Sequence, residues 1–305
     1  MLTCMQRREH AHDQSVWCCS WARPEASTSE YIVTGSLDNS VKIWQWNDLD
    51  LRQVFSLEQH NLGVISVDSR PSGNVAVSAG MDCTLQSYSV DTGSIRYSEP
   101  IDAGLVESWT VALSPDSQQF ATGAGGGKIS LYNVDSGQKE TTLESGGKFM
   151  LSVAYSTDGK YLASASSEGI VYVFDLTTGT LLHTMEGHAM AIRALIFSVD
   201  GRMLFSGSDD RYIKMHDLAS STPPVGTLPG HMSWVTSLSA SVDGSRIASG
   251  SCDHTVRVWD LAARQTLHTF KEHTDQVWCV RFNAAGSRLV SVSDDRSIAV
   301  YSVPV

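Results

Sequence analysis

A unit of about 43 residues recurs seven times along this chain, and each copy carries the same polar residues at the same offsets. The units start 42 to 48 residues apart, near His12, His60, Gly104, Gly146, His188, His231 and His273. A period this regular, with short strands inside each unit, is typical of a β-propeller. We therefore predict an all-β fold in which residues 1–305 form a single seven-bladed ring.

The sixth unit shows how one copy folds. After His231, residues 233–238 alternate in polarity as a half-buried strand does. Asp243-Gly244 marks a tight hairpin turn, where glycine supplies a positive φ. Residues 246–251, 255–259 and 266–270 are the next three expected strands, and four short antiparallel strands make one blade.

Three kinds of residue keep one register in the units. A hydroxyl residue precedes the second turn by four positions: Thr34, Ser78, Thr122, Ser164, Ser206, Ser249 and Ser291. The turn itself carries Asp38, Asp82, Gly126, Glu168, Asp210, Asp253 and Asp295. Six residues later comes a bulky, mostly aromatic residue: Trp44, Tyr88, Tyr132, Phe174, His216, Trp259 and Tyr301.

Composition narrows the class of protein. Hydrophobic residues make up 42% of the chain, which is enough for a sizeable core, and no apolar run is long enough to span a membrane. A formal net charge of −11 disfavours nucleic acid as a direct partner, because phosphate binding depends on Lys and Arg. The six cysteines have neither CxxC nor disulfide-like spacing, so we expect a reduced, metal-free protein of the cytosol or nucleus.

The two ends of the chain predict how the ring closes. The seventh unit ends at Val305, just after its third strand, so its fourth strand is missing. The segment 1–11 precedes the first unit, and residues 2–9 have no other strand to pair with. We expect this segment to complete the seventh blade, which would leave no long edge exposed.

These motifs resemble the WD40-repeat family, in which Gly-His, Ser/Thr, Asp and Trp side chains form a hydrogen-bonded tetrad in each blade. The resemblance implies that His12, Thr34, Asp38 and Trp44 form one tetrad and that His231, Ser249, Asp253 and Trp259 form another. Buried polar side chains of this kind are tolerated only as mutual partners. Gly104, Gly146, Gly126 and Glu168 break the pattern, so the third and fourth blades are expected to lack full tetrads.

The fifth residue after each anchor stands out once these structural residues are set aside. It is Trp17, Ile65, Trp109, Leu151, Arg193, Thr236 and Trp278 in turn. In WD40 proteins this position lies at the mouth of the central channel on the top face. Trp278, Trp17, Ile65 and Trp109 belong to consecutive blades of a closed ring, so they would form an apolar arc. Large apolar patches and clustered tryptophans mark interfaces, although packing between blades is the alternative for each residue taken alone.

The same rim is expected to carry Phe149, Trp234 and three carboxylates, Glu107, Asp209 and Asp294. Carboxylates beside an aromatic surface can accept bidentate hydrogen bonds from an arginine of a ligand. We therefore hypothesise a peptide-docking rim, with aromatic residues for an apolar side chain and acidic residues for a basic one. Ordinary solvated surface charge is the alternative.

Catalytic and metal-binding interpretations are weak. Five of the ten histidines occupy the repeat anchor, and the others lack the spacing of a metal-ligand set. The turn carboxylates occur one per blade rather than paired for acid–base work. The glycine run 123–127 matches neither phosphate-loop pattern and falls at a turn. We expect no catalytic residue, no metal and no cofactor.

Four stretches, 32–38, 101–110, 147–156 and 182–190, carry a closer resemblance. They are similar to the branch of the family that supplies the WD-repeat subunit shared by the superkiller (Ski) complex and the RNA polymerase II-associated factor (Paf) complex.

This resemblance implies a scaffold of the nucleus and cytoplasm, monomeric within hetero-complexes, that acts in mRNA decay, transcription elongation and histone methylation. Its partners would be the tetratricopeptide-type scaffold and helicase of the Ski complex and the Paf subunits, with no membrane partner. The alternatives are a histone-tail or degron receptor of another complex and, from a different class, a propeller enzyme with a site in its channel.

Overall fold

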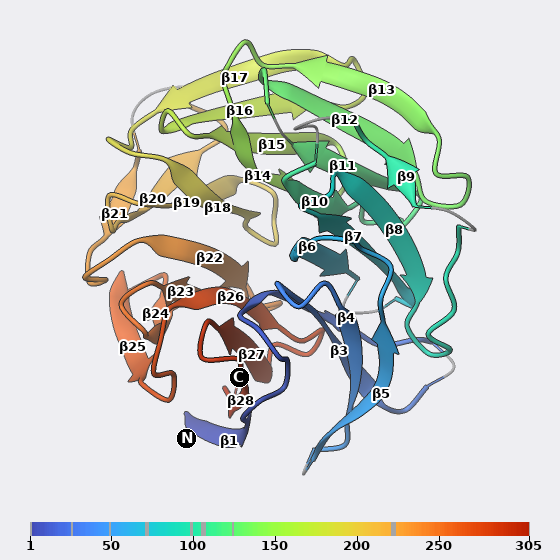
Figure 1. The fold of residues 1–305 in the computed structure, drawn as a ribbon. Coiled ribbons are helices and arrows are strands. Elements are labelled where there is room, and N and C mark those ends of the chain that lie inside the picture. Colours follow the sequence, from blue (N-terminus) through green and yellow to red (C-terminus); the bar gives the residue numbers. More distant parts are fainter. Residues whose placement is uncertain are drawn as a thin grey trace.

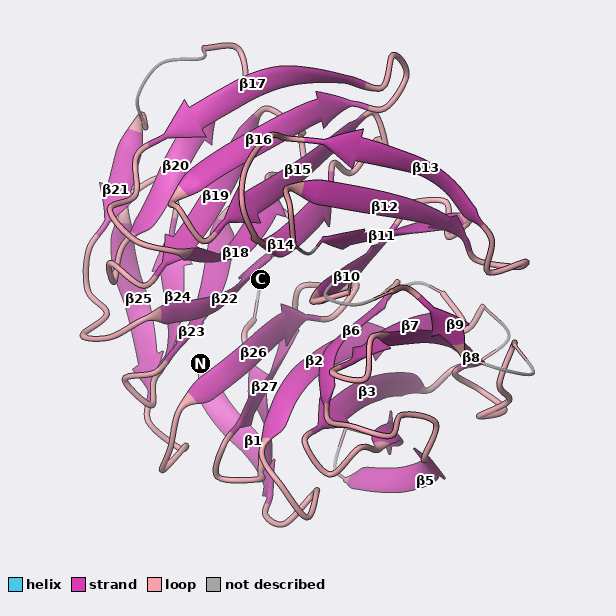
Figure 2. Cartoon of the chain, turned by 45° about the horizontal axis from the view of Figure 1, so that its top comes forward, coloured by secondary structure: helices cyan, strands magenta, loops and turns pink. Residues whose placement is uncertain are grey.

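The computed structural model describes residues 2–25, 27–48, 50–70, 73–97, 100–104, 108–123, 125–220 and 224–304. Within them the chain forms strands β1–β28 and no helix, and these strands make seven four-stranded antiparallel sheets arranged in a ring (Figures 1 and 2). The predicted seven-bladed propeller is therefore confirmed. No helix in this part of the chain is long and apolar enough to cross a membrane.

In blades one to six the strands follow the chain from the central channel outward, and blade numbers follow the repeats. Blades one and two comprise β2 (Val16–Ala22), β3 (Glu30–Ser36), β4 (Val41–Trp46), β5 (Leu51–Leu57), β6 (Val64–Ser69), β7 (Val75–Gly80), β8 (Thr84–Ser89) and β9 (Ile101–Asp102). Blades three and four comprise β10 (Thr110–Leu113), β11 (Gln119–Gly123), β12 (Lys128–Asn133), β13 (Lys139–Glu144), β14 (Met150–Tyr155), β15 (Tyr161–Ser166), β16 (Ile170–Asp175) and β17 (Thr180–Glu186).

Blades five and six comprise β18 (Ile192–Phe197), β19 (Met203–Ser208), β20 (Ile213–Asp217), β21 (Gly226–Leu228), β22 (Val235–Ala240), β23 (Arg246–Ser251), β24 (Val256–Asp260) and β25 (Gln265–Phe270). Blade seven comprises β26 (Val277–Phe282), β27 (Arg288–Ser293), β28 (Ile298–Ser302) and, as its outer strand, β1 (Thr3–Arg8). Both chain ends therefore belong to the same blade.

Ring closure follows the sequence-based expectation. β1 pairs antiparallel with β28, from Thr3 opposite Ser302 to Arg8 opposite Ile298. The Arg7 guanidinium adds an ion pair with the carboxylate of Asp295 at 3.2 Å. The first strand of the chain therefore completes the last blade by backbone hydrogen bonds.

The hydrophobic core is divided among the seven boundaries between blades. Each boundary holds one cluster of buried apolar side chains supplied by both neighbouring blades. A blade alone has two apolar faces and can bury them only against its neighbours, so the stability of each blade depends on the closed ring.

A tetrad of hydrogen bonds fixes the top of blade six. His231 Nδ1 lies 2.8 Å from Asp253 Oδ2, His231 Nε2 lies 2.7 Å from Ser249 Oγ, and Trp259 Nε1 donates to Ser249 Oγ at 2.8 Å. A carboxylate only accepts, so the histidine proton belongs on Nδ1. Nε2 must then accept from the serine hydroxyl, whose oxygen accepts from the indole. The result is a one-directional chain of buried donors and acceptors.

The tetrad varies from blade to blade. Blade one forms it with His12, Thr34, Asp38 and Trp44, with the same contacts. In blades two and seven a tyrosine hydroxyl takes the place of the indole, and in blade five His216 Nε2 lies 2.9 Å from Ser206 Oγ.

By the same argument His216 must carry its proton on Nε2 and donate it to Ser206, which leaves Nδ1 unprotonated. Nδ1 of His216 is buried and has no hydrogen-bond partner in the described chain. The tetrad of blade five is therefore complete but contains one unsatisfied acceptor.

Blade four lacks the tetrad, as expected. Met150 lies on the histidine side, and Ser164 Oγ contacts its thioether sulfur at 3.3 Å. The aromatic position holds the buried Phe174, which has no polar group. In blade three Gly104 and Gly126 stand at the histidine and carboxylate positions, so the imidazole–carboxylate pair is missing there too.

Candidate functional site: the mouth of the central channel

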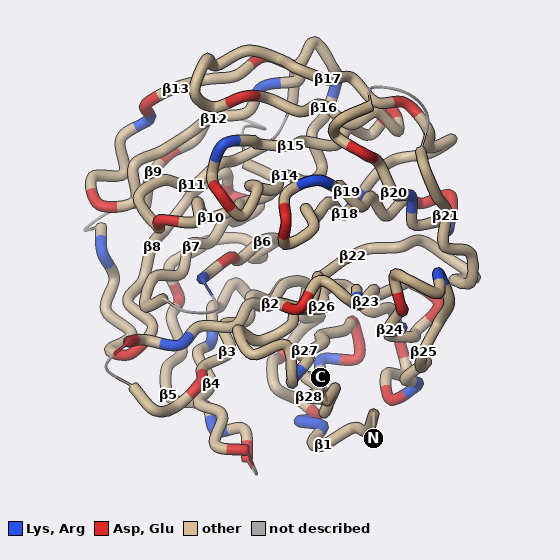
Figure 3. Tube along the Cα trace, turned by 180° about the vertical axis from the view of Figure 1, so that it is seen from behind, with Lys and Arg blue, Asp and Glu red and all other residues tan. Residues whose placement is uncertain are grey.

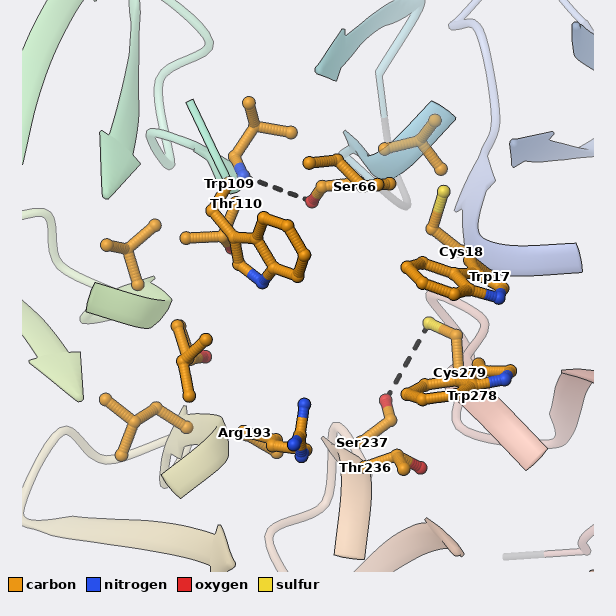
Figure 4. Close-up of a pocket in the computed structure, with 18 of the residues that line it drawn as sticks. Trp17, Cys18, Ser66, Trp109, Thr110, Arg193, Thr236, Ser237, Trp278 and Cys279 are labelled. Atoms are coloured by element: carbon orange, nitrogen blue, oxygen red, sulfur yellow. Dashed lines mark hydrogen bonds between the residues drawn. The ribbon is translucent and has the colours of Figure 1, made fainter. Parts of the chain in front are cut away.

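Seven side chains, one from each blade, surround the mouth of the central channel. They are the residues five positions after the anchors: Trp17, Ile65, Trp109, Leu151, Arg193, Thr236 and Trp278. Figure 4 shows labelled members of this set arranged around an open space, and the cavity they line has a volume of about 160 Å³. The repeat register therefore brings these residues together at one place.

A β-bulge positions six of these seven side chains. The pairing of each inner strand with the next strand skips one residue, and the skipped residues are Trp17, Ile65, Leu151, Arg193, Thr236 and Trp278. In blade three Trp109 lies just before β10 and donates its backbone N–H to the Gly123 carbonyl at 3.0 Å. A bulge bends the strand and re-aims a side chain, so here the unpaired residue is directed into the channel mouth.

Aromatic contacts form one half of the mouth. The rings of Trp17 and Trp278 stack with centroids 4.9 Å apart, and Trp109 meets Phe149 edge to face at 5.7 Å. Ile65 lies between these pairs in ring order, and all five side chains are partly exposed. These side chains form a partly open apolar arc that spans blades seven to four.

Leu151, Arg193 and Thr236 complete the ring of mouth residues, and here one hypothesis needs correction. Asp209 is not available to a ligand arginine, because Arg193 occupies it with Nε at 2.5 Å from Oδ1 and Nη2 at 2.9 Å from Oδ2. The same guanidinium lies 4.5 Å above the centroid of the Trp234 ring. The carboxylate is 6% exposed, so this ion pair is largely shielded from water.

The remaining rim carboxylates differ in their surroundings. Asp294 is partly exposed and accepts a hydrogen bond from Trp17 Nε1 at 3.3 Å through Oδ1. This contact crosses from blade one to blade seven and orients the indole. Glu107, the third carboxylate of the hypothesis, lies outside the residues that the structure describes.

Sequence reasoning missed a second apolar group on the same face. Met190 and Met232, which are 48% and 74% exposed, lie in the loops that follow the anchor histidines of blades five and six. Trp234, which was expected on this rim, is 39% exposed and follows Met232 by two residues. The sequence signal was a methionine one or two residues after the anchor histidine in two consecutive units. Methionine suits a binding surface because its unbranched thioether side chain adapts to varied partners.

The channel mouth brings together indole, aliphatic, hydroxyl and guanidinium groups. Within the described ranges no three His, Cys, Asp or Glu residues are placed to hold a metal ion. The tetrad carboxylates are engaged in structure: burial raises the pKa of Asp253, but hydrogen bonds from His231 and Thr255 outweigh it and hold that pKa well below its usual range. The chemistry that this site supports is binding.

Fold and site together define a class of protein: a closed propeller that presents a partly open aromatic rim around its channel. Comparison with known families gives the narrower assignment. The family model described as WD domain, G-beta repeat matches residues 3–45, 51–89, 137–175, 179–217, 222–260 and 264–302, so the chain belongs to the WD40-repeat family. The unmatched interval 90–136 contains β9–β12 and hence most of blade three, where the tetrad residues are replaced.

Three relatives illustrate what the chain is similar to. It is 39% identical to the WD repeat-containing protein SL1-17 of Schistosoma mansoni over 98% of this chain and 97% of that protein. It is 40% identical to the WD repeat-containing protein VIP3 of Arabidopsis thaliana over 44% of this chain and 41% of that protein. It is 33% identical to Superkiller complex protein 8 of Dictyostelium discoideum over 31% of this chain and 29% of that protein.

Proposed function

We propose that this protein is a non-catalytic scaffold that docks segments of partner proteins on its top face, as a subunit of the Ski and Paf complexes. The observation that carries the proposal is the arc of partly exposed aromatic side chains around the channel mouth. The partial similarity to Superkiller complex protein 8 and the four sequence stretches described above support the choice of complexes. These complexes imply work in both nucleus and cytoplasm.

The arc suits an apolar side chain of a docked segment. Trp17 and Trp278 already stack on each other, so a ligand need not order two flexible residues to create this surface. Rigid aromatic side chains of this kind dominate binding energy at interfaces.

Charge favours a partner segment with a basic residue. The chain has 33 acidic and 22 basic residues, and Figure 3 shows both kinds distributed over all blades rather than separated. At the mouth, Arg193 is neutralised by Asp209, whereas Asp294 is partly exposed and accepts a hydrogen bond from the neutral indole of Trp17. A cation placed beside Asp294 and Trp17 would meet both a carboxylate and an aromatic face.

The test is affinity purification from cell extract with a folded triple variant, Trp17→Ala/Trp109→Ala/Trp278→Ala. The matched control is Leu181→Ala/Leu182→Ala, which removes side chains 40% and 44% exposed on the outer strand β17, away from the mouth. Circular dichroism and melting curves establish that both variants are folded.

We expect wild type and the control to recover Ski and Paf subunits and the triple variant to lose at least one set. Retention of both sets by the triple variant would contradict docking at the mouth. Recovery of neither set by wild type would contradict membership of these complexes.

A further inference from the structure

Three cysteines lie on the inner strands of the two blades that close the ring. Cys18 and Cys19 lie on β2 of blade one, and Cys279 lies on β26 of blade seven. All three side chains are buried. Successive strand residues point to opposite faces, and accordingly Cys18 contacts the Val64 carbonyl of blade two at 3.9 Å. Cys19 instead joins Cys279 in the core between blades one and seven.

Cys19 and Cys279 are neighbours in this core. The sulfur of Cys279 lies 3.5 Å from the carbonyl oxygen of Cys19, although 260 residues separate them in the chain. The hydroxyl of Ser237 donates to the same sulfur at 3.7 Å (Figure 4). Cys279 thus has a thiol neighbour on one side and a hydroxyl donor on the other.

Cys279 also has access to small solutes. It lines the cavity at the channel mouth, as Cys18 does, whereas Cys19 does not. Cys279 is 5% exposed and Cys19 is fully buried. The two thiols are therefore unequal in exposure.

The two thiols also differ in pKa. A hydrogen bond from the Cys19 thiol lowers the pKa of Cys279. Burial opposes this shift, and the charge of Arg281 adds to it. Burial raises the pKa of Cys19 well above its usual value. The thiolate is the reactive form of cysteine. Cys279 is therefore the expected nucleophile, and Cys19 is the thiol that would react in the second step.

We propose that Cys279 and Cys19 form a peroxide-sensitive pair that is converted to a disulfide between blades seven and one. The Cys279 thiolate attacks one oxygen of hydrogen peroxide, the O–O bond breaks, and hydroxide leaves to give a sulfenic acid. The Cys19 sulfur then attacks the Cys279 sulfur, the S–O bond breaks, and the oxygen leaves as water. In sum, two thiols and one peroxide give one disulfide and two waters.

The disulfide would act on the closure of the ring. At present blades seven and one are joined covalently only by the chain that leaves β1 and enters β2. A bond between Cys19 and Cys279 would enclose nearly the whole ring in one covalent loop. Closing a loop of this length constrains the unfolded chain, so we expect the melting temperature to rise by about 5 °C or more.

The test uses the purified full chain, reduced, desalted and exposed to hydrogen peroxide. Remaining thiols are then alkylated, and the digest is searched by mass spectrometry for a peptide that links β2 to β26. Three variants identify the partner: Cys19→Ser and Cys279→Ser should abolish the link, and Cys18→Ser, equally buried and adjacent, should keep it. Reducing agent should reverse both the link and the rise in melting temperature.

Two results would overturn the proposal. One is oxidation confined to the less buried Cys4, Cys83 and Cys252 while Cys19 and Cys279 are recovered as alkylated thiols. The other is a linked peptide that persists in Cys19→Ser and disappears in Cys18→Ser. The first result needs only the wild-type protein, so it stands even where a variant fails to fold.

Discussion

The tetrad predicts that one substitution will have very different costs at two equally buried positions. Ser249 in blade six and Ser164 in blade four occupy the same register, and both are fully buried. Ser249→Ala removes the partner of two buried groups, the indole N–H of Trp259 and Nε2 of His231. Ser164→Ala removes only a contact with the thioether of Met150.

The magnitudes follow from these contacts. A buried polar group left without a partner costs about 1–3 kcal/mol, so Ser249→Ala should lose about 2–5 kcal/mol of unfolding free energy. Because a thioether is a weak acceptor, Ser164→Ala should lose no more than about 1 kcal/mol. For a chain of this size the corresponding falls in melting temperature are roughly 4–10 °C and under about 2 °C.

Urea unfolding followed by tryptophan fluorescence and calorimetry would measure both variants. A further change, Trp259→Phe, should cost less in the Ser249→Ala background than in wild type, because the indole has already lost its acceptor. Equal losses for the two serine variants, or strictly additive costs for Ser249 and Trp259, would refute the reasoning that the tetrad stabilises its blade.

Three other perturbations test separate parts of the structure. Deleting residues 1–9 removes the outer strand of blade seven and should cost several kcal/mol, roughly one per lost hydrogen bond; an unchanged melting temperature would contradict closure by β1. Burial, then the charges of His188 and Lys214, lowers the pKa of His216 from 6.5 to about 4. As the pH falls, the unfolded chain therefore binds this proton before the folded protein does. The contribution of His216 to the unfolding free energy is complete above pH 6.5 and decreases below that pH. His216→Phe should thus reduce the slope of unfolding free energy against pH by about 1 kcal/mol per pH unit between pH 6.5 and 5.5; urea titrations that give the same slope for both proteins would contradict this. A Cβ at Gly80 would lie 2.5 Å from Nδ1 of His60, so Gly80→Ala should lose about 1–3 kcal/mol; an unchanged urea midpoint would count against a rigid tetrad in blade two.

The repeat allowed most of the fold to be predicted, because the polar residues that recur in each copy lie at or near turns and so delimit the strands. In blade six the expected strands 246–251, 255–259 and 266–270 differ from β23, β24 and β25 by at most one residue at either end. The expected strand 233–238 is shifted more, since β22 starts at Val235. Ser233 and Trp234 instead belong to the loop on the top face, where Trp234 packs under the guanidinium of Arg193.

The candidate site was only partly predictable. Register placed the seven mouth residues together because every copy has the same offset, but the bulge that directs six of them into the channel leaves no mark in a single sequence. The pairing of Arg193 with Asp209 was also missed. In blade seven the equivalent carboxylate, Asp294, meets Trp17 of the neighbouring blade instead. Which contact forms depends on the side chain at the bulge, and repeat position alone does not determine it.

Closure by β1 also has a consequence for biosynthesis. β1 is synthesised long before its partner β28, because the strands of six other blades lie between them in the chain. At 5–20 residues per second, translation of 305 residues takes about 15–60 s. During that interval the nascent chain carries an unpaired strand and an open blade boundary that chaperones could occupy. The ring can be completed only after β28 has been synthesised, so blade seven cannot close before the other six blades have been made.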